Sequence, residues 1–271
     1  MSEPETALPE GTEVRTYFVR ERNAMLARAD VGELFVDYYL HLHDQALRHE
    51  PTPDRMLKEG LVALLLHSAS RPWNESIAWT MNFQHPLLNL FVASDNRLAT
   101  IVGNVFTKNI KENQTNLFYS DLVRNGDTPR RSVVTFEGSQ VLPAVEQYWA
   151  QSEQRPARFF QVNDEDYVFI TAQPDCDLEW LAGLTSESIQ NLDETETLSL
   201  LETRYYKWFC GCSEERLLPM LATAMKVDRE GLFGDDASIR VTCPRCGADY
   251  TVTREMLEKN LGQSSSRETI D

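Results

Sequence analysis

Four of the five cysteines of this chain form two closely spaced pairs, and their spacing constrains the fold more than any other feature. The first pair lies in Cys210-Gly211-Cys212, and after thirty intervening residues the second lies in Cys243-Pro244-Arg245-Cys246. Four thiolates complete the tetrahedral shell of a Zn²⁺ ion and leave no position open for a substrate. The pattern therefore predicts a closed, non-catalytic zinc site whose ligands are Cys210, Cys212, Cys243 and Cys246.

The two pairs need different backbone turns. Two residues between Cys243 and Cys246 let the chain turn so that both sulfurs face one point, and Gly247 can take a left-handed conformation just after the turn. In a strand, the side chains of residues i and i+2 point to the same face of the sheet but run parallel to each other. The sulfurs of Cys210 and Cys212 can therefore converge on one ion only if the chain turns at Gly211.

Zinc thiolates are also targets for oxidants. The two sulfurs of each pair are the nearest partners for a disulfide, and a disulfide sulfur is a poor zinc ligand. Structural zinc contributes about 10–16 kcal/mol to the folding of small metal modules, so its loss should unfold the module that it holds. A permanent zinc site with no switching role is the alternative interpretation.

The residues around both pairs resemble a known redox module. Tyr206–Leu218, around the first pair, and Val241–Tyr250, around the second, are similar to the C-terminal module of the 33 kDa chaperonin family, the redox-regulated, ATP-independent heat-shock holdases of bacteria. Phe136–Pro156, with its Ser152-Glu153-Gln154 run, resembles the same family. Weaker similarity extends the match to roughly residues 15 to 260.

One turn departs from the family pattern. Where the family usually has a Gly-Asp-Gly-Pro-Leu-type turn, this chain has Gln84-His85-Pro86-Leu87, and it is identified as a divergent member. The resemblance implies that oxidation pairs Cys210 with Cys212 and Cys243 with Cys246, releases zinc and exposes apolar surface to unfolding client proteins. It also implies a homodimer when oxidised and a role in the stress response.

The sequence pattern and the resemblance together divide the chain into five parts. We expect a disordered lead (1–13), an N-terminal α+β substrate-binding domain (14–174), an acidic helical linker (175–208), a C-terminal four-cysteine zinc domain (209–261) and a flexible tail (262–271).

The linker is unusual in composition. Residues 175–203 contain eight acidic residues and no basic one, together with leucines spaced as in helices. Such a segment has apolar surface but repels itself, so its fold should depend on its neighbours. A solvated acidic helix pair is one interpretation. The resemblance implies another, a metastable linker that stays docked over client-binding surface while zinc is bound and unfolds after oxidation.

Hydrophobic periodicity elsewhere indicates an α+β fold with an antiparallel-rich sheet. Helices are expected over 23–49, over 55–70 with Asp54 as cap, around Val145, and over 254–261 with Thr253 as cap. Strands are expected over 14–19, 77–83, 88–93, 98–105, 117–119, 131–137, 159–162, 167–172, 239–242 and 250–252. Residues 228–236 are expected to form a turn-rich connection.

The net charge and the length of the apolar runs limit which partners the protein can bind and where in the cell it is expected. The net charge of −16 opposes binding to a nucleic-acid backbone or an anionic membrane. No run approaches the roughly 18 apolar residues of a membrane span, and Met1–Gly11 does not read as a secretory signal. We expect a cytoplasmic protein. The sequence contains neither the phosphate-binding motif G-x-x-x-x-G-K-[ST] nor the dinucleotide-binding motif G-x-G-x-x-G, so ATP-driven cycling is not expected.

A static zinc-ribbon recognition module and an enzyme are the two alternative functional classes. A static zinc ribbon could present Arg240 and Arg245 to a nucleic acid or a protein. An enzyme would need a convergent acid, base and nucleophile, and neither the His41/His43 pair nor His67 beside Ser68 provides one, so we expect no catalytic residues. Cys176, outside the pairs, is interpreted as a small packed residue.

Overall fold

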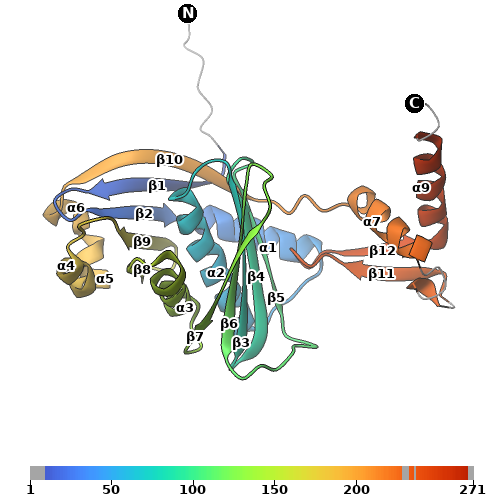
Figure 1. Cartoon of the computed structure of the whole chain (residues 1–271), viewed down its shortest axis with the longest axis horizontal. Coiled ribbons are helices and arrows are strands. Elements are labelled where there is room, and N and C mark those ends of the chain that lie inside the picture. Colours follow the sequence, from blue (N-terminus) through green and yellow to red (C-terminus); the bar gives the residue numbers. More distant parts are fainter. Residues whose placement is uncertain (1–9, 228–231, 235, 268–271) are drawn as a thin grey trace, which may run out of the picture. The chain divides into compact units, whose positions relative to one another are not determined.

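The computed structural model describes residues 10–227, 232–234 and 236–267, and the chain divides into two compact units (Figure 1). The first unit comprises the chain up to Asp44 and Arg48–Phe209, and the second comprises Gln45–Leu47 and the chain from Cys210 onward. No helix in the described part of the chain is long and apolar enough to cross a bilayer.

A ten-stranded sheet forms the framework of the first unit, with strand order β7-β6-β3-β4-β5-β10-β1-β2-β9-β8. Described neighbours pair antiparallel, except that β10 runs parallel to β5 at Lys207↔Thr100 and Trp208↔Ile101. This confirms the predicted α+β class with an antiparallel-rich sheet. The strands are β1 (Thr12–Val19), β2 (Ala24–Asp30), β3 (Glu75–Gln84), β4 (Leu87–Asp95), β5 (Thr100–Phe106), β6 (Asn116–Arg124), β7 (Arg130–Phe136), β8 (Ala157–Gln161), β9 (Asp166–Ala172) and β10 (Leu198–Trp208).

Helix α2 (Pro51–Ala69) covers one face of this sheet and contacts β4 and β5 as well as β1, β2 and β9. Side chains of β3 alternate between buried and half-buried, as expected when one face meets a helix. A Cβ at Gly103 would lie 2.8 Å from Leu57 Cδ1, so glycine permits the close approach of helix and strand. The first unit also contains helices α1 (Gly32–Asp44) and α3 (Val141–Tyr148), and the π-helical turn η1 (Trp149–Glu153) follows α3.

The predicted helix over 23–49 is correct only for residues 32–44, because α1 spans Gly32–Asp44. Residues 24–30 form β2, paired with β1 and β9, and the helix α1 begins only at Gly32. Asp54 is not a cap either, because α2 begins at Pro51 and the Asp54 carboxylate accepts hydrogen bonds from the hydroxyls of Tyr38 and Tyr39. In both places contacts with distant residues override the local pattern.

The predicted helical linker is corrected in its second half. Residues 198–208 form β10, which pairs with β1 along its length and with β5 at its end. The leucines near its start belong to a strand, and Arg204 and Tyr206 are the buried positions near its end. Pairing with two strands distant in sequence determines this conformation, which spacing alone did not reveal.

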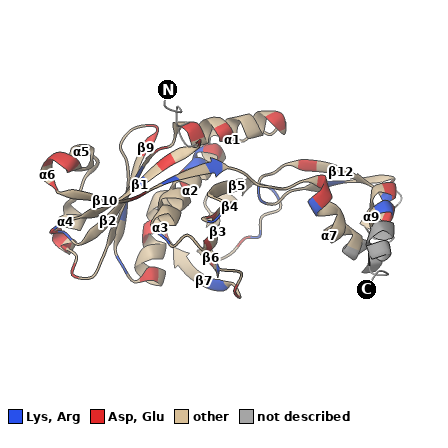
Figure 2. Ribbon diagram, turned by 90° about the horizontal axis from the view of Figure 1, so that it is seen from above, with Lys and Arg blue, Asp and Glu red and all other residues tan. Residues whose placement is uncertain are grey.

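The first half of the acidic segment forms three short helices, α4 (Leu178–Gly183), α5 (Ser186–Gln190) and α6 (Leu192–Thr195). Figure 2 shows acidic residues on all three. Their apolar side chains nevertheless pack on the sheet in one core cluster, which we call the segment core. Its buried members are Val19, Ala24, Leu26, Phe160, Val168, Ile170, Ala172, Leu181, Leu184, Ile189 and Leu192.

The second unit contains α7 (Glu214–Val227), the hairpin of β11 (Ser238–Thr242) and β12 (Asp249–Thr253), and α9 (Arg254–Arg267). The predicted hairpin is present, and the Thr253 hydroxyl accepts the Met256 N–H at the start of α9 as expected of a cap. The predicted tail is wrong for 262–267, which continue α9. Residues 268–271 lie outside the described residues, as do 228–231 and 235 of the expected connection.

The expected disordered lead is also too long, because β1 begins at Thr12, where pairing with Tyr206 of β10 fixes the backbone. Residues 1–9 lie outside the described part of the chain.

Candidate metal centre

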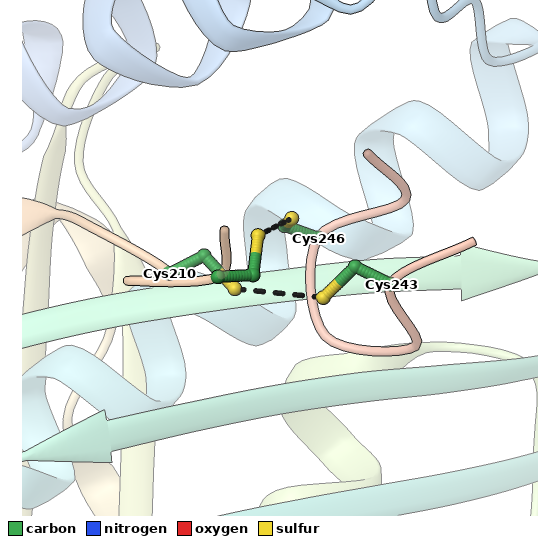
Figure 3. Close-up of side chains that lie close together, drawn as sticks. Cys210, Cys243 and Cys246 are labelled. Carbon is green, nitrogen blue, oxygen red and sulfur yellow. Dashed lines mark hydrogen bonds between the residues drawn. The ribbon is translucent and has the colours of Figure 1, made fainter. Parts of the chain in front are cut away.

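The sulfurs of Cys210, Cys212, Cys243 and Cys246 all lie within 4.8 Å of one another. The Cys210 and Cys243 sulfurs are 3.7 Å apart, and those of Cys212 and Cys246 are 3.4 Å apart (Figure 3). Zinc–sulfur bonds of 2.3 Å in a regular tetrahedron place the sulfurs about 3.8 Å apart, whereas a disulfide needs about 2.05 Å. The spacing suits four thiolates around one ion.

The backbone holds the Cys243/Cys246 half of the cluster. The Cys243 N–H donates to the Ala248 carbonyl at 2.7 Å, and the Gly247 N–H donates to the Cys243 carbonyl at 2.9 Å. Gly247 has φ of +79°, the left-handed conformation expected from the sequence. The N–H groups of Arg245 and Cys246 also donate to the Cys243 sulfur. This half is therefore a tight turn that points its N–H groups at sulfur.

Side chains hold the Cys210/Cys212 half. Gly211 provides the predicted turn with φ of +69°. Its carbonyl accepts a 2.7 Å hydrogen bond from Arg216 in α7, and the Cys210 carbonyl accepts one of 3.5 Å from Arg245. The Tyr250 hydroxyl on β12 donates to the Cys212 sulfur at 3.1 Å. Each residue of this loop is thus held by a side chain from another part of the unit.

Charge at the cluster favours a cation. The Cys243 sulfur accepts hydrogen bonds from the Cys210 and Cys246 thiols, which lowers the pKa of Cys243. The same contact raises the pKa of Cys210 to about 12, and hydrogen bonding to Cys210 and Cys243 raises the pKa of Cys246. Thiols packed this closely cannot all ionise unless a cation balances their charge. A divalent ion with an affinity for thiolate fits this donor set.

The unit around the cluster has a small apolar core. Its buried described members are Ala222, Phe233, Val252 and Leu257, packed against partly buried residues that include Leu218 and Val241. A core of this size in a module of about 60 residues rarely stabilises a fold unaided, and natural modules of this kind add disulfides or a structural metal. The described cysteines are free thiols and form no disulfide, so a bound metal is the cross-link that fits this unit.

Comparisons with known proteins agree with this geometry. The family model of the Hsp33 protein matches residues 170–253, a range that contains the acidic segment and all four cysteines. The 33 kDa chaperonin of Nitrosococcus oceani is 25% identical over 230 residues, which cover 75% of this chain and 80% of that protein. The 33 kDa chaperonin of Yersinia pestis (strain Pestoides F) is 25% identical over 258 residues, covering 82% and 87%. These matches confirm the resemblance to the 33 kDa chaperonin family that the sequence indicated.

A solved structure shares the fold. The crystal structure of the 33 kDa chaperonin (heat shock protein 33 homolog) of Thermotoga maritima superposes with a TM-score of 0.69 and 14% sequence identity. The match covers 95% of this chain and 100% of that chain. The two chains therefore share a fold although few of their residues are identical.

The helical half of the acidic segment, α4–α6, is held at both ends by one residue. Arg22, in the turn between β1 and β2, donates from Nη1 to Asp177 at 2.8 Å and from Nε to Glu196 at 3.0 Å. Asp177 begins α4, where its carboxylate accepts the Trp180 N–H at 2.9 Å, and Glu196 follows α6. Arg158 on β8 adds hydrogen bonds to carbonyls of α4, including that of Ala182 at 3.0 Å.

His67, Ser68 and Cys176, which the sequence analysis considered, are packed within the first unit. His67 is fully buried between the rings of Trp79 and Trp149, and burial lowers its pKa well below the usual value. Its neighbour Ser68 bonds to Ser94 at 2.6 Å. Cys176 packs against the segment core, where burial raises the pKa of its thiol. These are properties of packed residues.

Arg22 and Tyr250 make contacts that the sequence does not indicate. Arg22 lies 155 positions from Asp177 in the chain, and nothing near it in the sequence indicates that partner. Tyr250 stands four residues after Cys246, and alternation along β12 could have indicated its side, but not its hydrogen bond to Cys212. Of the arginines that a static zinc ribbon would present, Arg240 is paired with Asp249.

Proposed function

We propose that this protein is a member of the Hsp33 family and a redox-regulated chaperone that holds unfolding proteins without ATP and prevents their aggregation. The observation that carries the proposal is the cluster of four thiol sulfurs within 4.8 Å of one another. The curated relatives, named 33 kDa chaperonins, support the chaperone role. The expected clients are unfolded or partly unfolded proteins, and the expected location is the cytoplasm.

In the reduced state, Cys210, Cys212, Cys243 and Cys246 hold Zn²⁺ as thiolates. The ion supplies the positive charge and the cross-link that the small core of the second unit needs. N–H groups directed at sulfur from the turn after Cys243 spread the negative charge of the site over the backbone. The centre is closed to substrates, so its role is structural and sensory, and not enzymatic.

Oxidation converts the four thiolates into two disulfides, Cys210–Cys212 and Cys243–Cys246. Each pair of thiolates gives two electrons to one molecule of hydrogen peroxide, which accepts them as its O–O bond breaks and leaves as two hydroxide ions. Two peroxide molecules thus consume all four thiolates, and the metal is left without ligands. The pairs match the two turns of the chain, one at Gly211 and one at Pro244 and Arg245.

Unfolding of the second unit then affects the acidic segment because β10 connects the two along the chain. β10 ends at Trp208, two residues before Cys210, and begins at Leu198, three residues after α6. The segment is held by one apolar cluster and by Arg22 and Arg158, and it carries charges that repel one another. Unfolding of the second unit releases one end of β10, which weakens the docking of α4–α6. The apolar residues of the segment core then become available to clients.

The segment 175–208 therefore acts as the linker of the switch, with the sheet unit before it as the substrate-binding domain and the four-cysteine unit after it as the sensor. Dimerisation of the oxidised form is part of the proposal, since joining two exposed apolar surfaces enlarges the area offered to a client.

A paired assay tests this function. Zinc release and suppression of aggregation of a heat-unfolded model enzyme are measured before and after treatment with peroxide at mildly elevated temperature. We expect one zinc per chain in the reduced protein, its release by peroxide, and suppression only afterwards. Equal suppression by the intact reduced protein would disprove the redox part, and no suppression in either state would disprove the chaperone assignment.

A further inference from the structure

The four sulfurs of the cluster differ in how they are supported. Backbone N–H groups support the sulfurs of Cys243, Cys246 and Cys210, whereas the Cys212 sulfur accepts a side-chain hydrogen bond, from the Tyr250 hydroxyl at 3.1 Å. The carbonyls of Cys210 and Gly211 on the same loop are bonded to Arg245 and Arg216. Tyr250 therefore contacts a sulfur, whereas the two arginines contact backbone carbonyls.

The hairpin holds the Tyr250 ring in place. Tyr250 pairs with Val241 across the two strands, and the buried Val252 pairs with Ile239 two residues further along the hairpin. Its neighbour Asp249 accepts hydrogen bonds from Arg240 and from the Thr242 hydroxyl, which fix the start of β12. The hydroxyl is therefore presented to Cys212 by an ordered strand and not by a loop.

A hydrogen bond to a thiolate changes its chemistry. The phenol O–H attracts one sulfur lone pair, which makes that lone pair less available to an oxidant and lowers the charge that the sulfur donates to a metal. Residues that donate hydrogen bonds to metal ligands also fix their orientation, and replacing such residues costs about 10- to 100-fold in metal affinity or activity.

We infer that Tyr250 is a positioning residue that orients the Cys212 sulfur toward the metal and protects it from oxidation. This inference rests on the proposed zinc switch and adds to it a side chain that sets the threshold. When peroxide attacks, a thiolate lone pair forms an S–O bond, the O–O bond breaks and hydroxide leaves. The second thiolate of the pair then displaces another hydroxide and forms the disulfide. The Tyr250 hydrogen bond slows the first of these steps at Cys212.

The test replaces the hydroxyl and retains the ring. In Tyr250→Phe, we expect zinc affinity, measured by competition with a chelator, to fall about 10- to 100-fold. We also expect peroxide to release zinc about tenfold faster, in keeping with the same range. In the cobalt-substituted protein, the sulfur-to-cobalt charge-transfer band should shift, because a thiolate that loses a hydrogen bond donates more charge. A change in packing alone would leave that band in place.

Tyr205→Phe is the matched control. Its hydroxyl donates to Glu13 at 2.8 Å within the first unit, so this variant loses a comparable hydrogen bond without touching the cysteines. Zinc affinity, release rate and cobalt spectrum should stay as in the original protein.

A measurement on the unaltered protein makes the test independent of how the variant folds. Limited alkylation of the zinc-loaded chain, followed by peptide mass spectrometry, should modify Cys212 more slowly than Cys210 of the same loop. Equal or faster modification of Cys212, or a Tyr250→Phe protein unchanged in all three measurements, would overturn the inference and leave the zinc switch intact. An unaltered protein that binds no zinc would overturn both.

Discussion

Replacing Leu192 by alanine tests whether burial of apolar side chains docks the acidic segment. Leu192 in α6 is 3% exposed and belongs to the segment core. Truncating a buried leucine to alanine costs about 2–5 kcal/mol, from lost transfer free energy and from the cavity left behind. At about 1.4 kcal/mol for each factor of ten, the undocked population should rise about 30-fold to about 4,000-fold.

The assay is hydrogen exchange of the reduced, zinc-loaded protein, followed by mass spectrometry of peptides from α4, α5 and α6. Local opening controls exchange in a segment of this kind, so the exchange rates should rise by the same factor. Zinc content should stay at the level of the original protein, because Leu192 lies outside the second unit. Suppression of aggregation should appear without any oxidant.

The matched control is Leu178→Ala in α4. Leu178 is 55% exposed, so the same chemical change should alter docking by no more than about 0.5 kcal/mol. If both variants exchange alike, or if Leu192→Ala leaves the segment as protected as before, apolar burial does not dock the segment. If the segment opens but the reduced protein still fails to suppress aggregation, undocking is not the activating step.

Three further predictions concern the cysteines and the ends of the segment. Cys210→Ser should abolish tight zinc binding while Cys176→Ser leaves it unchanged; stoichiometric zinc in Cys210→Ser would show that the ligands are misassigned. Arg22→Gln removes the contact with both ends of the segment and should increase proteolysis there at full zinc content, so an unchanged cleavage rate would contradict the role of the arginine. The pKa of Asp177 is lowered from 3.8, mainly by the hydrogen bond from the Trp180 N–H. Its stabilisation of docking is therefore complete above pH 3.8 and is lost as the pH falls through the lowered value. Tryptophan fluorescence should show this acid transition, and Asp177→Asn, which retains a capping side chain, should lack it.

The spacing of apolar residues along the sequence correctly predicted the strands and helices that bury one face. In β3, the apolar residues Ile77, Trp79, Met81 and Phe83 of the expected strand over 77–83 are the buried positions, and the residues between them are half-buried. The cysteine spacing likewise predicted which side chains would meet, because a turn at Gly211 and another before Gly247 bring each pair together within a few residues.

Elements determined by distant partners were not predictable in this way. Residues of β2 continue the apolar spacing of the helix after them, and their strand conformation comes from pairs such as Ala24↔Ala172. The leucines at the start of β10 fit a helix equally well, and β1 decides the outcome through Leu200↔Tyr17. The contact of Tyr250 with Cys212 spans 38 positions. Spacing in a single sequence carries no information on such pairings.

The central place of β10 in the sheet bears on how the protein is made on the ribosome. β10 is the last strand of the first unit in sequence, yet it lies between β5 and β1. Phe106 at the end of β5 and Trp208 at the end of β10 are 102 positions apart, so at about 5–20 residues per second the nascent chain waits about 5–20 s before β10 can complete the sheet. During that interval β5 and β1 each present an open edge, which invites pairing with other chains. A protein proposed to guard others against aggregation thus passes through a stage of synthesis in which it needs the same protection.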